Sequence, residues 1–101
     1  MKKNCMVERL LHQSRGSFTV SNARGLHTRP STELVKCAAS FNSEVRLIYH
    51  RQKVNAKSLL GILMLAAPKG AKIAIEAEGE DADEAVSSIL DLAKDNFHIR
   101  Y

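Results

Sequence analysis

The chain contains the run Gly25-Leu26-His27-Thr28-Arg29-Pro30-Ser31, and its proline decides where the first helix begins. Proline has no backbone N–H and a fixed φ, so it fits a helix only near the start, where no hydrogen bond is lost. After this run, apolar residues recur at helical spacing, at Leu34, Val35, Ala38 and Ala39. We therefore predict a helix that begins within the run and ends near residues 40–42, with His27 at or just before its N-terminus.

A histidine in this position can act on phosphate. The free amides of the first turn and the positive end of the helix dipole favour anions. A nucleophilic imidazole at His27 could carry a phosphoryl group there, with Arg29 shielding its charge. The plainer alternative is that His27 is only a helix cap or a solvated surface residue and Arg29 a solvated charge.

Length and composition indicate a single globular domain. The chain has 101 residues, of which 45% are hydrophobic and 26% charged, and both fractions are ordinary for a globular protein. No apolar run approaches the roughly 20 residues that a membrane-spanning helix needs. The start Met1-Lys2-Lys3 is typical of a signal peptide, but Glu8 and Arg9 interrupt the apolar stretch that should follow. We therefore expect a cytoplasmic protein.

Charge, aromatic residues and cysteines narrow the classes of function. The formal net charge of +4 suits acidic protein partners at least as well as nucleic acid. The aromatic residues form no pattern for stacking bases. Cys5 and Cys37 are too few for a disulfide framework, so we expect buried, reduced thiols. His12, His50 and His98 share no ligand spacing, and we predict no metal.

Four segments have the patterns of β-strands, at residues 18–20, 45–49, 52–55 and 72–78. The last is the clearest, because Ile73, Ile75 and Ala77 alternate with polar or small residues, as in a half-buried strand. His50-Arg51 joins the two middle strands where a tight hairpin prefers Asn-Gly, since both positions of such a turn need a positive φ. We expect strain or a looser turn there.

Two further helices complete the predicted order. A short apolar helix begins at Ser58, a natural N-cap, and reaches Leu65. The third opens at Asp81 or Asp83 and carries an apolar stripe of Val86, Ile89, Leu90, Ala93 and Phe97. The order β-α-β-β-α-β-α predicts an α+β fold, a two-layer open-faced sandwich with a four-stranded antiparallel sheet and three helices on one face. Residues 1–15 would be an N-terminal arm, either disordered or one short helix, before a domain at 16–101.

Two motifs in this order resemble one family. Gly25-Leu26-His27-Thr28-Arg29-Pro30 resembles the active-site signature of HPr, the histidine-containing phosphocarrier of the bacterial sugar phosphotransferase system. Lys57-Ser58-Leu59-Leu60-Gly61-Ile62-Leu63 is similar to the HPr segment in which a dedicated kinase phosphorylates a serine at the start of the second helix. The separation of the motifs and the order of the strands also match.

The resemblance implies a role for each matched residue. His27 would accept a phosphoryl group on Nδ1 from phosphorylated enzyme I, itself charged by phosphoenolpyruvate, and pass it to a histidine of an enzyme IIA domain. Arg29 would steady the group, and Ser58 would be the regulatory site of a serine kinase/phosphorylase. The partner-docking surface would be Leu59, Leu60 and Leu63, with Thr28 and Lys57 at its edge. The family also implies a monomeric carrier without a cofactor, rather than an enzyme with its own turnover.

Some features depart from the family, and two other functions compete. Arg24 stands where family members more often carry a small polar residue, and it adds positive charge near His27. The same fold could instead be a regulatory adaptor that acts through Ser58 phosphorylation and docking on a regulator, although retention of His27 and Arg29 argues against this. A small nucleic-acid-binding domain agrees with the charge, but no aromatic platform or Gly-rich clamp supports it.

Overall fold

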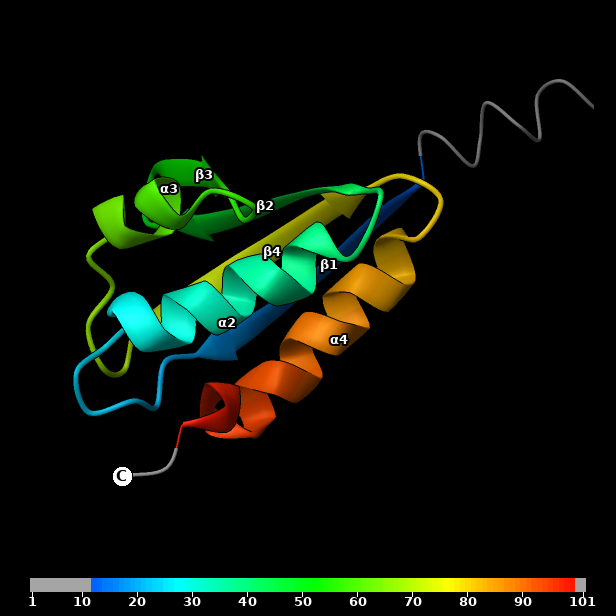
Figure 1. The fold of residues 1–101 in the computed structure, drawn as a ribbon. Helices are drawn as coiled ribbons and strands as arrows, with labels where there is room; N and C mark the ends of the chain where they lie inside the picture. Colours follow the sequence, from blue (N-terminus) through cyan, green and yellow to red (C-terminus); the bar gives the residue numbers. More distant parts are fainter. Residues whose placement is uncertain (1–11, 100–101) are drawn as a thin grey trace, which may run out of the picture.

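The computed structural model describes residues 12–99 (Figure 1). The predicted arm up to residue 11 and Cys5 lie outside these residues. Along the chain the elements are β1 (Gln13–Thr19), α2 (Thr28–Ala39), β2 (Glu44–Tyr49), β3 (Gln52–Asn55), α3 (Leu59–Met64), β4 (Lys72–Glu78), α4 (Ala82–Lys94) and a short 3₁₀ turn, η1 (Asn96–His98).

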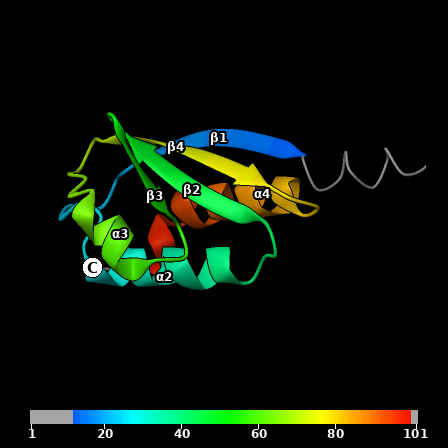
Figure 2. The ribbon, with the colours of Figure 1, turned by 90° about the horizontal axis from the view of Figure 1, so that it is seen from above.

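The strands form one antiparallel sheet in the order β1-β4-β2-β3. The helices of residues 12–99 lie on one face of this sheet, and the other face is open (Figure 2). The predicted α+β open-faced sandwich is therefore confirmed. No helix within residues 12–99 has the length and apolar character needed to cross a bilayer.

In strand β4 the alternation of the sequence places apolar side chains on the face covered by helices and polar or small side chains on the open face. Ile73, Ile75 and Ala77 are buried beneath the helices, as their alternation predicts. Glu76 points to the open face, where it pairs with cations of three other strands: Lys53 at 3.3 Å, and Arg15 and Arg46 each at 3.5 Å.

Strand β1 begins earlier than predicted, at Gln13 rather than near residue 18. Residues 13–15, which the sequence pattern placed in the arm, therefore pair with β4, and Gln13 lies opposite Glu78. The pattern gave no signal because this half of the strand has no large apolar side chain. At Gly16 a Cβ would lie 2.9 Å from a methyl group of Val86, so helix α4 leaves no room for one.

The hairpin between β2 and β3 is strained at one residue only. His50 has a φ of +56°, whereas Arg51 does not have a positive φ. The expected strain is therefore present, and it lies at His50 alone. A positive φ at the first central residue alone is typical of a type II′ turn, which also fits the twist of a hairpin.

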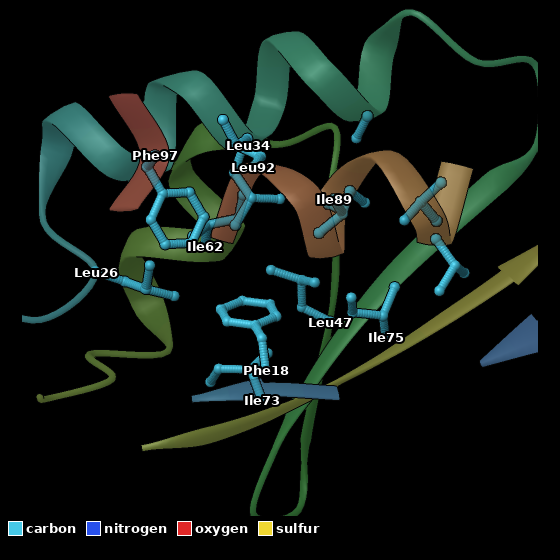
Figure 3. Packing of buried hydrophobic residues seen from close by; sticks show 14 of the residues in the cluster. Phe18, Leu26, Leu34, Leu47, Ile62, Ile73, Ile75, Ile89, Leu92 and Phe97 are labelled. Carbon is cyan, nitrogen blue, oxygen red and sulfur yellow. The ribbon is translucent and has the colours of Figure 1, made fainter. Parts of the chain in front are cut away.

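The core lies between the sheet and the helices (Figure 3). Phe18 of β1 and Phe97 of η1 meet there edge to face, with ring centroids 5.7 Å apart. Phe97 was predicted on the third helix, but α4 ends at Lys94 and the chain turns back through three residues with φ between +54° and +62°. This reversal brings the fully buried Phe97 onto Phe18.

Cys37 also differs from expectation. It is partly exposed on α2, at the edge of the core, rather than fully buried. Partial burial disfavours the thiolate and raises the pKa of its thiol.

Candidate functional site

His27 is the N-cap residue of α2, as the position of Pro30 predicted. Its backbone is extended, with φ −84° and ψ −168°, and its carbonyl accepts the first helical hydrogen bond from Ser31 N at 3.1 Å. Pro30 is the third residue of the helix, where its missing N–H is not needed. Pro30 and Ser31 are buried and anchor the start of the helix in the domain, whereas Thr28 and Arg29 are exposed to solvent.

The side chain of His27 does not cap the helix. Its Nδ1 lies 3.1 Å from the carbonyl oxygen of Gly25, and the imidazole is half-buried. A carbonyl oxygen only accepts, so Nδ1 carries the hydrogen in this contact. In neutral His27 the ring lone pair is then on Nε2, and Nδ1 becomes a nucleophile only after the proton has moved and the contact with Gly25 has opened.

The loop that carries His27 is held against the segment after α3. Gly25 has a φ of +71°, and a Cβ there would lie 2.4 Å from the carbonyl oxygen of Ala67. The next residue, Leu26, donates its N–H to that same oxygen at 2.9 Å and buries its side chain in the core. The backbone around the histidine is therefore packed tightly rather than loosely suspended.

The surroundings of His27 favour a bound anion. The first turn of α2 contains no acidic residue, and Arg29 is exposed at its second position. The helix dipole and the charge of Arg29 both make the start of the helix electropositive. Thr28 is exposed at the start of the helix, and its carbonyl accepts a hydrogen bond from Thr32 Oγ1 at 2.7 Å. Across residues 12–99, no three His, Cys, Asp or Glu side chains are placed to hold a metal ion.

The C-terminal turn also borders this site, which the sequence pattern did not reveal. Phe97, His98 and Ile99 share the lining of a hollow with Thr28 and Arg29. His98 is exposed here, with Nδ1 2.5 Å from Asp95 Oδ2. No local signal could place it, because about seventy residues separate this turn from the first residues of α2.

Ser58 caps α3, as expected. Its Oγ accepts a hydrogen bond from Gly61 N at 3.1 Å. Its neighbour Lys57 reaches back to the loop after α2 and donates from Nζ to the Phe41 carbonyl at 2.7 Å. Lys57, which was expected at the edge of a docking surface, thus also holds two loops together.

Helix α3 exposes an apolar surface, as its composition suggested. The exposed fractions are 36% for Leu59, 70% for Leu60 and 69% for Met64, and we call these three residues the α3 patch. Leu63, which was expected in the docking surface, is half-buried, and Met64 was not assigned to it. Which residues face outward depends on how this short helix lies on the sheet, and an all-apolar helix carries no local signal of that. An exposed patch of this kind is typical of a protein-binding site.

A family model and several solved structures both match this chain, and both indicate one family. The family model described as the PTS HPr component phosphorylation site matches residues 14–95. An HPr protein from Thermoanaerobacter tengcongensis is 33% identical, covers 87% of this chain and 99% of its own, and superposes with a TM-score of 0.82.

Two other solved structures are similar. The histidine-containing phosphocarrier protein of a Mycoplasma is 32% identical over 87% of this chain and 100% of its own, with a TM-score of 0.80. The catabolite repression protein Crh of Bacillus subtilis, described as a domain-swapped dimer, is 35% identical over 77% of this chain and 90% of its own, with a TM-score of 0.66. The chain therefore belongs to the HPr family of phosphocarrier proteins of the phosphotransferase system.

Proposed function

We propose that this protein carries a phosphoryl group on Nδ1 of His27, taken from phosphorylated enzyme I and given to a histidine of an enzyme IIA domain. One observation carries the proposal above the others. His27 is the N-cap of a twelve-residue helix whose first turn has no acidic residue, and Arg29 lies two positions further on. A helix N-terminus is suited to bind phosphate, and the imidazole supplies the nucleophile.

The transfer is a displacement at phosphorus. The proton on Nδ1 first moves to Nε2 through solvent, and the ring turns away from the Gly25 carbonyl. The Nδ1 lone pair then forms a bond to phosphorus while the P–N bond of the donor phosphohistidine breaks. The donor imidazole leaves with that electron pair and takes up a proton from solvent, and Nε2 of His27 releases its proton to solvent. Transfer to the acceptor histidine is the same exchange, with phosphorylated His27 now as the donor. No water, metal or cofactor is consumed.

The chain's own contribution is position and charge. Phosphoryl transfer depends mainly on alignment and on stabilising the charge of the equatorial oxygens. Arg29 and the amides of the first turn supply positive charge where those oxygens would lie. The α3 patch would bring the partner's histidine into line, with Thr28 and Lys57 at the edge of the contact.

The decisive experiment is phosphorylation by enzyme I and labelled phosphoenolpyruvate. We expect acid-labile label on the wild-type protein and on His12→Ala, which changes a histidine at the first strand, and none on His27→Ala. Nitrogen chemical shifts of the labelled protein would show whether Nδ1 or Nε2 carries the phosphorus. Failure to label the wild type, with the same enzyme I active on another carrier, would contradict the proposal.

We propose further that Ser58 is a regulatory phosphorylation site. A phosphate on its Oγ would stand at the start of α3, beside Leu59 and Leu60, and would put nearly two negative charges at the edge of the α3 patch. Ser58→Asp keeps an N-cap but adds charge, so we expect slower transfer from enzyme I with little change in stability. Ser58→Ala removes the cap, which should cost about 1 kcal/mol of stability and leave the transfer rate near that of the wild type.

A second function has one observation in its favour. Similarity to Crh suggests a regulatory adaptor of the same fold, which would act mainly through Ser58 and docking on a regulator. The two proposals differ at His27, which an adaptor does not need. Labelling of His27 by enzyme I supports the carrier, whereas its absence, combined with phosphorylation of Ser58 by a serine kinase, would support the adaptor.

A further inference from the structure

Two β-turns lie together at the end of the molecule that carries His27. One spans residues 22–25 and the other residues 68–71, and a hydrogen bond of 3.0 Å between its first and last residues closes each turn. Each turn exposes one cation, Arg24 in the first and Lys69 in the second. We call these two residues the turn cations.

Backbone hydrogen bonds hold the two turns side by side. Val20 N donates to Ala71 O at 2.8 Å, Gly70 N donates to Val20 O at 2.7 Å, and Leu26 N donates to Ala67 O at 2.9 Å. These bonds flank both turns, so the positions of the two backbones relative to each other and to the start of α2 are set by the fold. A partner that binds there meets a surface whose backbone is already ordered.

The turn cations are not neutralised by the rest of the described chain. Neither Arg24 nor Lys69 makes an ion pair or a side-chain hydrogen bond with any of residues 12–99. Three cations of the open sheet face differ, because Glu76 pairs with Arg15, Arg46 and Lys53. As far as residues 12–99 are concerned, the positive charge next to the site can therefore act on an approaching molecule.

Acidic residues gather at the opposite end of the molecule. Strand β4 runs from Lys72, beside the turns, to Glu78 at the far end, where α4 begins (Figure 1). The far end carries Glu78, Glu80, Asp81, Asp83 and Glu84. This separation of charge gives the molecule an electrostatic polarity that would orient an acidic partner toward the histidine end.

We propose that the turn cations recognise carboxylates around the phosphohistidine of the phosphoryl-donor protein and so select this donor. The proposal rests on the proposed carrier function. The chain continues from the α3 patch through residues 65–71, which lie at the same end of the molecule as α3 and the start of α2 (Figure 1), so apolar and positively charged side chains are exposed at one end. Exposed leucine and methionine side chains suit a protein surface rather than a nucleic acid backbone. Arg24 and Lys69 thus act on partner choice, and Arg29 acts on the transferred group.

The test compares two pairs of substitutions that remove the same charge. Arg24→Gln/Lys69→Gln removes the turn cations, and Arg15→Gln/Lys53→Gln removes two cations of the open face. Rapid-quench kinetics with phosphorylated enzyme I give the second-order rate constant and the rate at saturating donor. Phosphoramidate, a small donor that needs no protein docking, reports acceptance by His27 itself. Measurements at about 0.01 M and about 1 M salt compare weak with strong screening.

We expect the turn-cation variant to lose about tenfold in the second-order rate constant at low salt, and less than about twofold at high salt. Its rate at saturating enzyme I and its rate with phosphoramidate should stay near the wild-type values, and the open-face variant should stay within about twofold of the wild type throughout.

Three results would overturn the proposal: an unchanged second-order rate constant, an equal loss in the open-face variant, or a loss that persists at saturating donor or with phosphoramidate. Salt-sensitive binding of single-stranded RNA that requires Arg24 and Lys69, with unchanged donor kinetics, would overturn it in favour of nucleic acid. If the wild type accepts phosphate from neither donor, the carrier function itself fails, and that outcome is distinct from the other results.

Discussion

Single residues set the geometry of the loop that carries His27. Gly25 is the tightest point, since its φ of +71° and its contact with the Ala67 carbonyl leave no room for a side chain. Two residues later, His27 begins α2 and keeps Nδ1 against the Gly25 carbonyl. The backbone of one residue therefore controls both the packing of the loop and the starting position of the nucleophile.

Gly25→Ala should destabilise the protein and slow phosphoryl acceptance. An L-residue with this φ costs about 1–2 kcal/mol, and the Cβ would also push the loop away from Ala67. Gly70→Ala is the matched control, because Gly70 has a φ of +90° and open space around the Cβ position. Urea unfolding of both variants should show the larger loss for Gly25→Ala. Equal losses would show that the contact with Ala67 has no energetic role.

Among the elements, α3 depends most on its two ends. It has six residues, fewer than an isolated helix needs to be stable. Ser58 caps its start, and Ala66, just after its last turn, has a φ of +50°. This is the position where helices usually end in glycine, because only glycine adopts the left-handed conformation without strain.

Ala66→Gly should therefore stabilise the protein, by about 1 kcal/mol. Ala66 is exposed, so the substitution removes no core contact. Ala39→Gly is the comparison, since Ala39 is an exposed residue with helical backbone at the end of α2. It should lower the melting temperature or leave it unchanged, whereas Ala66→Gly should raise it. A lower melting temperature for Ala66→Gly would contradict the strain at this position.

In the whole molecule, Asp81 joins the far end of the sheet to α4. Its carboxylate accepts hydrogen bonds from Ser43 Oγ, from Ser43 N at 2.9 Å and from Asn42 N at 2.8 Å. The bond from the Ser43 hydroxyl, supported by these amides, holds the pKa of Asp81 below its ordinary value. The folded state thus stabilises the ionised Asp81 carboxylate, so protonation of this carboxylate opposes folding.

Acid should weaken this connection in a defined pH range. Because the folded-state pKa is lowered, the contribution of Asp81 is complete well above the unfolded pKa of about 3.9. It is lost as the pH falls from about 5 through the lower folded-state pKa. The Asp81→Asn variant should be about 1 kcal/mol less stable than the wild type near neutral pH. Between pH values of about 5 and 3, its free energy of unfolding should fall less than that of the wild type.

Urea unfolding across this range measures both effects. Glu80→Gln, at the exposed neighbouring carboxylate, should keep the wild-type pH dependence. If Asp81→Asn loses as much stability in acid as the wild type, other carboxylates are responsible for the acid sensitivity.

The sequence by itself determined the features that depend on neighbours along the chain. Pro30 placed the start of α2, Ser58 placed the cap of α3, and alternation in residues 72–78 predicted β4 with its buried face. Each of these follows from backbone sterics or from the side-chain period of one element. The element order and the two motifs then led to the fold and the family.

Only the tertiary structure decided which distant segments meet. It extended β1 to Gln13 through pairing with β4, turned Phe97 back onto Phe18, and left Met64 exposed while burying Leu65. It also brought Arg24 and Lys69 onto adjacent turns. These features depend on packing and hydrogen bonds between residues far apart in the chain, and the local sequence carries no record of such contacts.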